Sequence, residues 1–577
     1  MRRFCLKITG ESGAGLLSTG EILTESFNAM GYFVVADREY PSLIKGGASC
    51  FMVNVSDGEI FGLSERVDVM LSIDKQSLLE YFGGLREEGV LVYGYERPLG
   101  VKDVLAELEA KRVKVVHAMS RELAENAGGN VLMVNMVMIG MLWKVLGLPY
   151  QFVEEEVKKK FASKPKLLAI DLDCLRAGFE ACESVFELFA PGERHGRVLR
   201  NGHQTLCDGA IVAGVGAYFA YPMSPSSNIL SYMAEEKEKR KEKKEESELI
   251  VKQIEDEISV VNMTLGAMFV GMRAFCGTSG GGFDLMTETV SLAGIIENPL
   301  VVVLAQRPGP GTGLPTWTGQ GDLNLALYSS HGEFARVVVA LSDPVDAHRI
   351  IQEAFNLAEV YQVPVIILSE KQIAETIVSI KEPSAVIEVR RGLVVDVKGL
   401  KPEDRYEITE SGVSRRWLPG ASKEAYYCAN GDEHWLDGSL TEKGDEAREM
   451  YAKRVRKLDA IAKELPQAEV LGCEVGAEIS FVGWGSTKSV MRDFIAQMEK
   501  DGKKVNYLHF NYLWPLKSER FLEFVAANEN VHLIEGNYTG QLGDLIKKET
   551  GFEFKGRLLK WDGRQFYLED LINYCHG

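Results

Sequence analysis

Short apolar runs alternate with amphipathic stretches along most of the chain, and this alternation constrains the fold more than any other feature. Near the start, residues 4–9 (FCLKIT) predict a strand and residues 10–15 (GESGAG) predict a glycine-rich turn. An amphipathic helix over 16–31, closed by Gly31, and a second strand over 32–37 follow. This order indicates a βαβ unit, and we therefore expect an α/β protein.

The pattern continues in three blocks, which predict three α/β domains. A chain of 577 residues is too long for one hydrophobic core. We expect α/β domains over residues 1–190, 200–378 and 466–577, with a linker over 188–202. Residues 379–465 are polar and rich in turn residues, and they predict an extended connector with hairpin-like pieces and a charged helix over 442–465.

The net charge argues against two classes of main partner, and the hydropathy argues against a membrane span and a signal peptide. The 65 Lys and Arg against 83 Asp and Glu leave a net charge of −18, which disfavours nucleic acid and anionic membrane surfaces. The most apolar stretch, residues 131–147, is shorter than the about 20 residues of a membrane span and predicts a buried helix. No apolar stretch near the N-terminus is long enough for a signal peptide, so we expect a cytoplasmic protein. Mixed charges over 235–248 predict a solvated helix, the alternative being an arm that docks a partner.

The cysteines and histidines predict that this chain binds no metal of its own. The nine cysteines are scattered, and no two have the Cys-x-x-Cys spacing of zinc ribbons and ferredoxin clusters. The nine histidines form no pair at helical ligand spacing.

Two segments rich in glycine or proline each allow two interpretations. Gly10, Gly13 and Gly15 lack the G-x-G-x-x-G spacing, so their segment is either a structural turn or a phosphate-binding turn at a helix start. Residues 215–230 (VGAYFAYPMSPSSNIL) lead from a strand into a Pro-x-x-Pro step. They form either a turn with a serine helix cap, or a loop whose N–H and hydroxyl groups bind a carboxylate.

Three further features of the central domain lie where a ligand could bind. Acids at 255–257 precede a helix of small residues, where the helix dipole favours a carboxylate. Residues 277–283 (GTSGGGF) predict a loop so poor in side chains that a large group could approach its backbone. Arg307 follows a strand over 299–306, at the end where open α/β sheets bind ligands. The alternatives are capping acids, a turn and a surface arginine.

In this order, the segments resemble the α subunit of the 2-oxoacid:ferredoxin oxidoreductases, in the form with a fused N-terminal γ domain. The segments that carry the resemblance are YPMSPSS (221–227), EDEI (255–258), TSGGGF (278–283) and QRPGPGTGLPT (306–316). HGEF (331–334), GDEH (431–434) and TGQLGDLI (539–546) are similar to later segments of the family, and EYPSLIKGGASC (39–50) to its γ domain.

The resemblance implies a fold and a set of partners. The first domain would be the γ domain, the central one a pyrimidine-type thiamine-diphosphate-binding fold, and the last one transketolase C-terminal-like. A partner β subunit would hold the diphosphate, Mg²⁺ and a 4Fe-4S cluster, in a heterodimer or a dimer of heterodimers. Coenzyme A would be the co-substrate and ferredoxin the electron acceptor.

The resemblance also assigns the site residues. Glu257 matches the glutamate that bonds the aminopyrimidine ring of the cofactor, and Tyr221 and Pro222 lie in the cofactor-binding motif. Ser224 and Arg307 match the residues at the 2-oxoacid, where a guanidinium fork suits a carboxylate.

Three departures from the family pattern leave the substrate open. Met223 and Ser224 stand where the family has Ile and Thr, and Gly281 stands where it has Pro. These changes reshape the pocket, so 2-oxoglutarate, pyruvate and branched-chain 2-oxoacids all remain candidates.

The expected function is the oxidative decarboxylation of a 2-oxoacid to acyl-CoA and CO₂, with the electrons passed to ferredoxin. One alternative is a self-sufficient thiamine-diphosphate decarboxylase, which needs a G-D-G…N diphosphate motif that does not occur in order here. The other is a non-catalytic assembly or regulatory paralogue, which the loss of Glu257 or Arg307 would favour; both residues are present.

Overall fold

The computed structural model describes residues 1–13, 15–43, 46–95, 102–192, 196–244 and 249–576, and it divides into two compact units. Unit 1 comprises Met1–Arg200, Glu375–Glu382 and Phe566–Gly577, and unit 2 comprises Asn201–Ala374 and Pro383–Gln565. Parts of the expected glycine turn, γ-domain segment, linker and charged helix (residues 14, 44–45, 193–195 and 245–248) lie outside the described residues. The expected domain boundaries stay a prediction.

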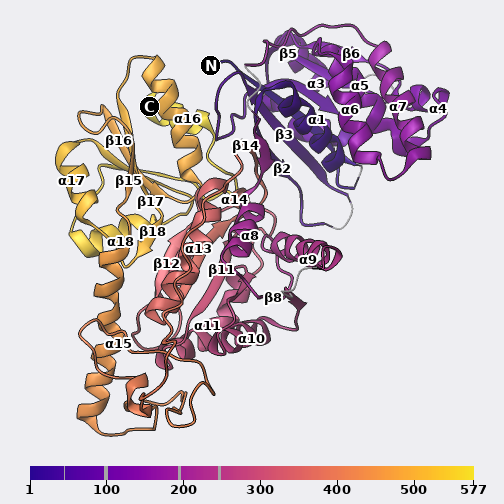
Figure 1. The fold of residues 1–577 in the computed structure, drawn as a ribbon. Coiled ribbons are helices and arrows are strands. Elements are labelled where there is room, and N and C mark those ends of the chain that lie inside the picture. Colours follow the sequence, from indigo (N-terminus) through magenta and orange to yellow (C-terminus); the bar gives the residue numbers. More distant parts are fainter. Residues whose placement is uncertain (14, 44–45, 96–101, 193–195, 245–248, 577) are drawn as a thin grey trace. The chain divides into compact units, whose positions relative to one another are not determined.

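Unit 1 is built on an eight-stranded sheet in the order β6-β5-β4-β1-β3-β2-β14-β7 (Figure 1). Its strands are β1 (Arg3–Glu11), β2 (Phe33–Glu39), β3 (Ala48–Ser56), β4 (Val67–Ser72), β5 (Leu85–Tyr93), β6 (Lys114–His117), β7 (Val198–Arg200) and β14 (Ile377–Ile380). Its helices are α1 (Leu16–Met30), α2 (Lys75–Tyr81), η1 (Phe82–Gly84), α3 (Lys102–Ala110), α4 (Ser120–Asn126), η2 (Val131–Met133), α5 (Val134–Val145), α6 (Tyr150–Phe161), α7 (Pro165–Glu180) and α19 (Leu568–His576).

The first three strands differ from the expected βαβ unit. β1, α1 and β2 occur as predicted, but β3 lies between β1 and β2 and is antiparallel to both. The side chains explain this position, because β3 is buried along almost its whole length and needs a neighbour on each side. Part of the expected linker is also a strand, since β7 pairs with β14.

The apolar stretch at 131–147 forms a buried helix as predicted, with α5 almost entirely shielded from solvent. Within the described ranges, no single helix has the length and hydropathy needed to cross a membrane. Only Ser120–Asn126 and Val131–Val145 together meet that test, and they are bent by 117°.

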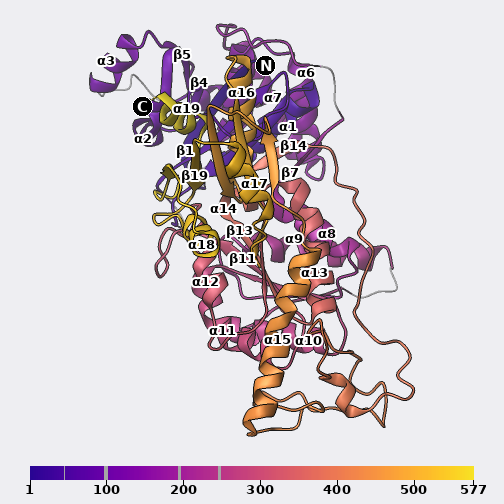
Figure 2. The same ribbon diagram turned by 90° about the vertical axis from the view of Figure 1, so that its left-hand side faces the viewer.

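Unit 2 contains the central sheet, in the order β18-β12-β13-β11-β10-β8-β9. All its pairings are parallel except that of the edge strand β18 with β12. Figure 2 shows the sheet between α11 and α12 on one side and α8 and α13 on the other. The elements up to the connector are α8 (Gly202–Val212), β8 (Ala217–Ala220), α9 (Ser227–Glu242), β9 (Ile250–Gln253), α10 (Glu257–Phe269), β10 (Ala274–Thr278), α11 (Gly280–Ile295), β11 (Leu300–Gln306), α12 (Leu323–Tyr328), β12 (Val337–Ala340), α13 (Pro344–Tyr361), β13 (Pro364–Glu370) and α14 (Lys371–Glu375).

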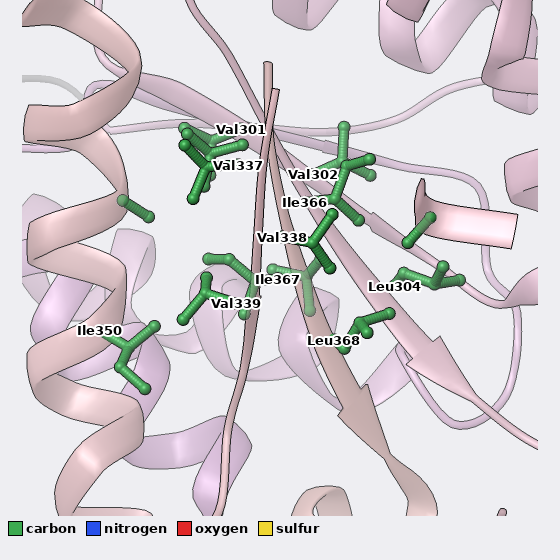
Figure 3. Packing of buried hydrophobic residues seen from close by; sticks show 14 of the residues in the cluster. Val301, Val302, Leu304, Val337, Val338, Val339, Ile350, Ile366, Ile367 and Leu368 are labelled. Atoms are coloured by element: carbon green, nitrogen blue, oxygen red, sulfur yellow. The ribbon is translucent and has the colours of Figure 1, made fainter. Parts of the chain in front are cut away.

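The core of the central sheet consists of branched aliphatic side chains. β11, β12 and β13 are continuous runs of Val, Ile and Leu that are buried on both faces, as expected for parallel strands covered by helices. In Figure 3 their side chains pack together, and Ile350 of α13 lies to one side of them. This rigid core holds the carboxyl ends of the strands in place.

A second sheet in unit 2 has the order β15-β17-β16-β19-β20. The charged helix predicted at the end of the connector is α15 (Gly444–Glu464), and the elements after it are β15 (Glu469–Gly472), β16 (Ile479–Trp484), α16 (Thr487–Lys500), β17 (Val505–Phe510), β18 (Tyr512–Trp514), α17 (Glu519–Ala527), β19 (Val531–Glu535), α18 (Gln541–Thr550) and β20 (Gly556–Leu559). β18 follows β17 directly and pairs with β12, so the two sheets of unit 2 are joined through this strand.

Residues 390–400 do not form the expected hairpin, although His434 and Leu440 form an antiparallel bridge further along the connector. Apart from η3 (Pro402–Arg405), residues 383–443 form no named helix or strand. Side chains of α13 take the place of a partner strand: Gln352 Oε1 accepts from the N–H of Ile387, and Asn356 Oδ1 accepts from the N–H of Arg390. The segment that predicted a hairpin is therefore part of an irregular chain that begins along α13.

Candidate active site

The candidate site lies at the carboxyl ends of three neighbouring strands of the central sheet. The chain leaves β8 into the loop at 221–226, leaves β10 into Ser279 at the start of α11, and leaves β11 into Arg307. β10 pairs with β8 and with β11, so these three exits are adjacent. Such edges of open α/β sheets are where ligands bind.

Arg307 and Ser224, which the sequence placed together, are in direct contact. Nη1 of Arg307 donates to the backbone carbonyl of Ser224 at 2.8 Å. Partial burial lowers the pKa of the Arg307 guanidinium from its ordinary value, and Asp322 opposes this shift. An arginine keeps its charge under such a shift, so the loop end of β11 carries a fixed cation.

Glu257 is the first residue of α10 and is buried, with 3% of its surface exposed. Its Oε1 atom is shielded from solvent and has no hydrogen-bond partner in the protein. The helix does not need it as a cap, because the side chain of Asp256 accepts from the N–H groups of Ile258 and Ser259. A buried carboxylate oxygen without a partner is costly, so its place indicates a ligand that donates a hydrogen bond.

Glycines open the space in front of this carboxylate. The segment GTSGGGF is not the expected loop: Ser279 is the N-cap of α11, and the three glycines form its first turn. A Cβ atom on Gly282 would lie 2.1 Å from Thr278 Oγ1 and 2.6 Å from Glu257 Oε1. On Gly281 it would meet only the carbonyl of Gly311, at 3.9 Å. Gly282 is therefore required beside the carboxylate, and Gly281 faces open space.

The other predicted residues lie at the rim of the site. Tyr221 is half-buried and packs against the central core, and Pro222 is exposed. Neither forms a hydrogen bond to Glu257 or Arg307, both of which lie in the described part of the chain. Met223 brings its Sδ atom to 4.0 Å from Thr278 Oγ1, so this departure from the family pattern changes the wall beside the glycines.

Asp322 is a site residue that the sequence reasoning missed. Its Oδ2 atom is buried without a hydrogen-bond partner, and its N–H donates to Gln306 Oε1 at 3.0 Å. Burial, reinforced by Asp284 and opposed by Arg307, raises the pKa of Asp322 to about 7. One feature of the sequence pointed to this residue: an acidic side chain stands directly after the glycine-rich segment that follows Arg307.

A buried polar network holds the segment between Arg307 and Asp322. Glu370, at the end of β13, accepts from Thr318 Oγ1 at 2.7 Å and from Gln320 Nε2 at 3.2 Å. Gln320 also accepts from the N–H of Gly536, beside β19 in the second sheet. Both sheets of unit 2 therefore fix this segment.

The unpartnered oxygen of Glu257 and the glycines beside it would suit the aminopyrimidine ring of thiamine diphosphate, whose ring nitrogen, when protonated, donates a hydrogen bond to a carboxylate. No group of three or more His, Cys, Asp or Glu side chains among the described residues is placed to hold a metal ion. The fold and this site are those of an α/β protein that binds a ligand at the carboxyl edge of its parallel sheet.

The comparisons with known proteins agree with that class. The family model "Pyruvate flavodoxin/ferredoxin oxidoreductase, thiamine diP-bdg" matches residues 208–410, and the model "Pyruvate ferredoxin/flavodoxin oxidoreductase" matches residues 5–181. The α subunit of 2-oxoacid:ferredoxin oxidoreductase 2 from Aeropyrum pernix is 31% identical, over 97% of this chain and 95% of the relative. The 2-oxoglutarate oxidoreductase subunit KorA of Mycobacterium tuberculosis is 28% identical, over 94% and 86% of the two chains.

A solved structure matches the whole chain. It is the 2-oxoglutarate:ferredoxin oxidoreductase from Magnetococcus marinus with 2-oxoglutarate, coenzyme A and succinyl-CoA bound. The match has a TM-score of 0.90 at 27% identity and covers 100% of this chain and 99% of that one. The chain belongs to the 2-oxoacid:ferredoxin oxidoreductase family, as an α subunit with a fused N-terminal γ domain. The resemblance stated from the sequence is confirmed.

Proposed function

We propose that this chain, with a β subunit, catalyses the oxidative decarboxylation of 2-oxoglutarate to succinyl-CoA and CO₂ and passes the electrons to ferredoxin. 2-Oxoglutarate is favoured over pyruvate because the solved relative that matches the whole chain has 2-oxoglutarate and succinyl-CoA bound. Among the relatives, the M. tuberculosis subunit is also named for 2-oxoglutarate.

The observation that carries the proposal is the buried, unpartnered Oε1 of Glu257 beside Gly282. Glu257 would accept a hydrogen bond from the aminopyrimidine ring, and Gly282 would leave room for that ring. When bound, thiamine diphosphate supplies the nucleophilic carbon and the electron sink that decarboxylation of a 2-oxoacid needs. Tyr221 and Pro222 would line the cofactor side of the loop after β8.

Arg307 would bind the carboxylate of the 2-oxoacid. Its Nη1 is held by the carbonyl of Ser224, which fixes the plane of the guanidinium and leaves its other N–H groups for an incoming anion. The hydroxyl of Ser224 would donate to the substrate from the same loop. A local cation is needed because the chain as a whole carries a charge of −18.

The rest of the chemistry would come from the partner. We assign the diphosphate, Mg²⁺ and the 4Fe-4S cluster to the β subunit, in a cytoplasmic heterodimer or dimer of heterodimers. All nine cysteines of this chain are free thiols, and five of them are buried. Coenzyme A would enter as co-substrate and ferredoxin as acceptor.

A substrate panel tests the choice of 2-oxoacid. The chain is co-purified with its β subunit, and kcat/KM is measured with a viologen dye for 2-oxoglutarate, pyruvate and 2-oxoisovalerate in the presence of coenzyme A. The proposal expects the highest kcat/KM for 2-oxoglutarate. A higher value for either of the other acids would contradict the assignment while leaving the reaction class intact.

A further inference from the structure

Two carboxyl groups, each with one buried oxygen that lacks a hydrogen-bond partner, flank the first turn of α11, and the proposed function uses only one of them. Glu257 lies against Gly282, while Asp322 lies against Gly280, where an added Cβ atom would be 2.8 Å from Asp322 Oδ2. The Asp322 side chain does not cap its own helix, α12. Its Oδ2 atom therefore lies buried beside the first turn of α11 without a hydrogen-bond partner in the protein.

The charged groups that act on Asp322 come from two other segments. Asp284, on α11, is exposed and repels a negative charge on Asp322, whereas Arg307, after β11, attracts it. Burial, reinforced by Asp284, outweighs Arg307, and the pKa of Asp322 rises to about 7. The group can thus hold a proton at neutral pH, and it lies in the field of the cation assigned to the substrate.

We propose that Asp322 is a proton-linked positioning residue for the 2-oxoacid: it is protonated when the substrate carboxylate is bound at Arg307, and it is ionised when the site is free at alkaline pH. An ionised Asp322 attracts Arg307 and repels the substrate carboxylate. A protonated Asp322 does neither and can donate a hydrogen bond to an oxygen of the bound acid. The inference rests on the proposed role of Arg307.

The coupling between substrate binding and protonation of Asp322 predicts the direction in which the affinity changes with pH. Because the bound anion favours the protonated form, substrate binding takes up a proton whenever free Asp322 is ionised. Below about pH 7 the affinity is constant, and above it the affinity falls by up to about tenfold for each pH unit. The 2-oxoacid stays fully ionised over this range, so the change belongs to the enzyme.

The test is the pH profile of kcat/KM for 2-oxoglutarate between pH 6 and 9, measured with the complete α–β enzyme. The wild type should lose efficiency above about pH 7, by roughly tenfold per unit. Asp322→Asn should abolish this limb. The matched control, Asp284→Asn, should keep the limb, because Asp284 is exposed and influences Asp322 only through its charge.

A binding measurement gives an independent readout. Calorimetric titration with N-oxalylglycine, an unreactive analogue of 2-oxoglutarate, in HEPES and in Tris at pH 8 reports the protons taken up on binding. The expectation is close to one proton for the wild type and for Asp284→Asn, and none for Asp322→Asn.

A wild-type profile without the alkaline limb, or an Asp322→Asn profile that retains it, would overturn the inference even if 2-oxoglutarate is turned over. The wild-type profile decides this by itself if Asp322→Asn fails to fold. A complete enzyme that turns over no 2-oxoacid would instead overturn the proposed function and, with it, this inference.

Discussion

The carboxylate of Glu257 is buried at a helix start with one oxygen unpaired, so a substitution that keeps its shape should separate chemistry from folding. Glu257→Gln preserves the packing beside Gly282, and we expect the free energy of unfolding to stay nearly unchanged. Removal of the charge should slow exchange of the cofactor C2 proton by about 10²–10⁴-fold, the usual range for a general acid–base group.

The measurement is C2 hydrogen–deuterium exchange in the assembled enzyme. Glu255→Gln is the matched control, because Glu255 is exposed and lies two residues away. Exchange at the wild-type rate in Glu257→Gln would move the role to another group.

Arg307 offers a second test at the scale of one residue. Loss of a hydrogen bond to a charged group costs about 1.5–3 kcal/mol, so Arg307→Ala should lower kcat/KM for the 2-oxoacid by roughly 10–150-fold. Arg307→Lys should recover only part of this loss, because an ammonium cannot form the planar fork that the Ser224 carbonyl orients. Equal efficiency in Arg307→Ala and the wild type would show that another group holds the carboxylate.

The sequence singled out Glu257, Ser224 and Arg307 because each stands in a recognisable segment. Asp322 stands in none of the quoted motifs, and its pKa is raised by burial and by Asp284 against the opposing charge of Arg307. Asp322, Asp284 and Arg307 come close to one another only in the folded protein, so the sequence around Asp322 does not indicate its raised pKa.

At the scale of elements, Gly281 and Gly282 in the first turn of α11 should respond to substitution by alanine in opposite ways. Gly282→Ala places a Cβ atom 2.1 Å from Thr278 Oγ1 and should destabilise the protein and block the cofactor site. Gly281→Ala faces open space, and it should stabilise the helix by about 0.4–1 kcal/mol because Ala loses less backbone entropy on folding. Chemical denaturation measures both, and equal effects of the two changes would contradict this account of the turn.

The docking of α15 on the central domain depends on a buried carboxylate. Glu297 Oε1 is 2.5 Å from Lys453 Nζ and its Oε2 is 2.6 Å from Lys457 Nζ, all fully shielded from solvent. Burial alone would raise the pKa of Glu297, but Lys453, Lys457 and Arg405 hold it below its ordinary range. Glu297 therefore stays ionised at neutral pH, whereas burial lowers the pKa of Lys457 and brings that of Lys453 to about 7.

Glu297→Gln should leave two buried lysines without a counter-charge and lower the free energy of unfolding by about 3–5 kcal/mol. The control, Glu446→Gln, removes a carboxylate that pairs with the exposed Lys443 at the start of the same helix, and it should change little. Urea denaturation compares the two, and a loss no larger for Glu297→Gln than for the control would contradict the buried role.

Most strands and helices could be predicted from the sequence, because the spacing of apolar residues and the positions of glycines are features of each short segment by itself. The errors concern elements whose partner is distant in the chain. β3 separates β1 from β2, and the glycines at 280–282 begin a helix instead of forming a loop. The expected hairpin at 390–400 is instead part of a chain that begins along α13.

At the scale of the whole molecule, the chain returns to its first unit twice. β14 joins the N-terminal sheet after the central domain, and α19 joins the same unit from the end of the chain. Such contacts cross hundreds of residues, and no local pattern announces them. The family resemblance and the three α/β sheets could be read from the sequence, whereas this return of the chain could not.

The central claim is that this chain binds the pyrimidine ring of the cofactor and the carboxylate of the 2-oxoacid, and that it needs a β subunit to catalyse the reaction. The most direct test is the rate of viologen reduction with 2-oxoglutarate, coenzyme A, thiamine diphosphate and Mg²⁺, for the isolated chain and for the chain co-purified with its β subunit. We predict no reduction by the isolated chain, and reduction by the complex that depends on both the 2-oxoacid and coenzyme A. Turnover by the isolated chain at the rate of the complex, or a complex inactive with every 2-oxoacid, would contradict the account.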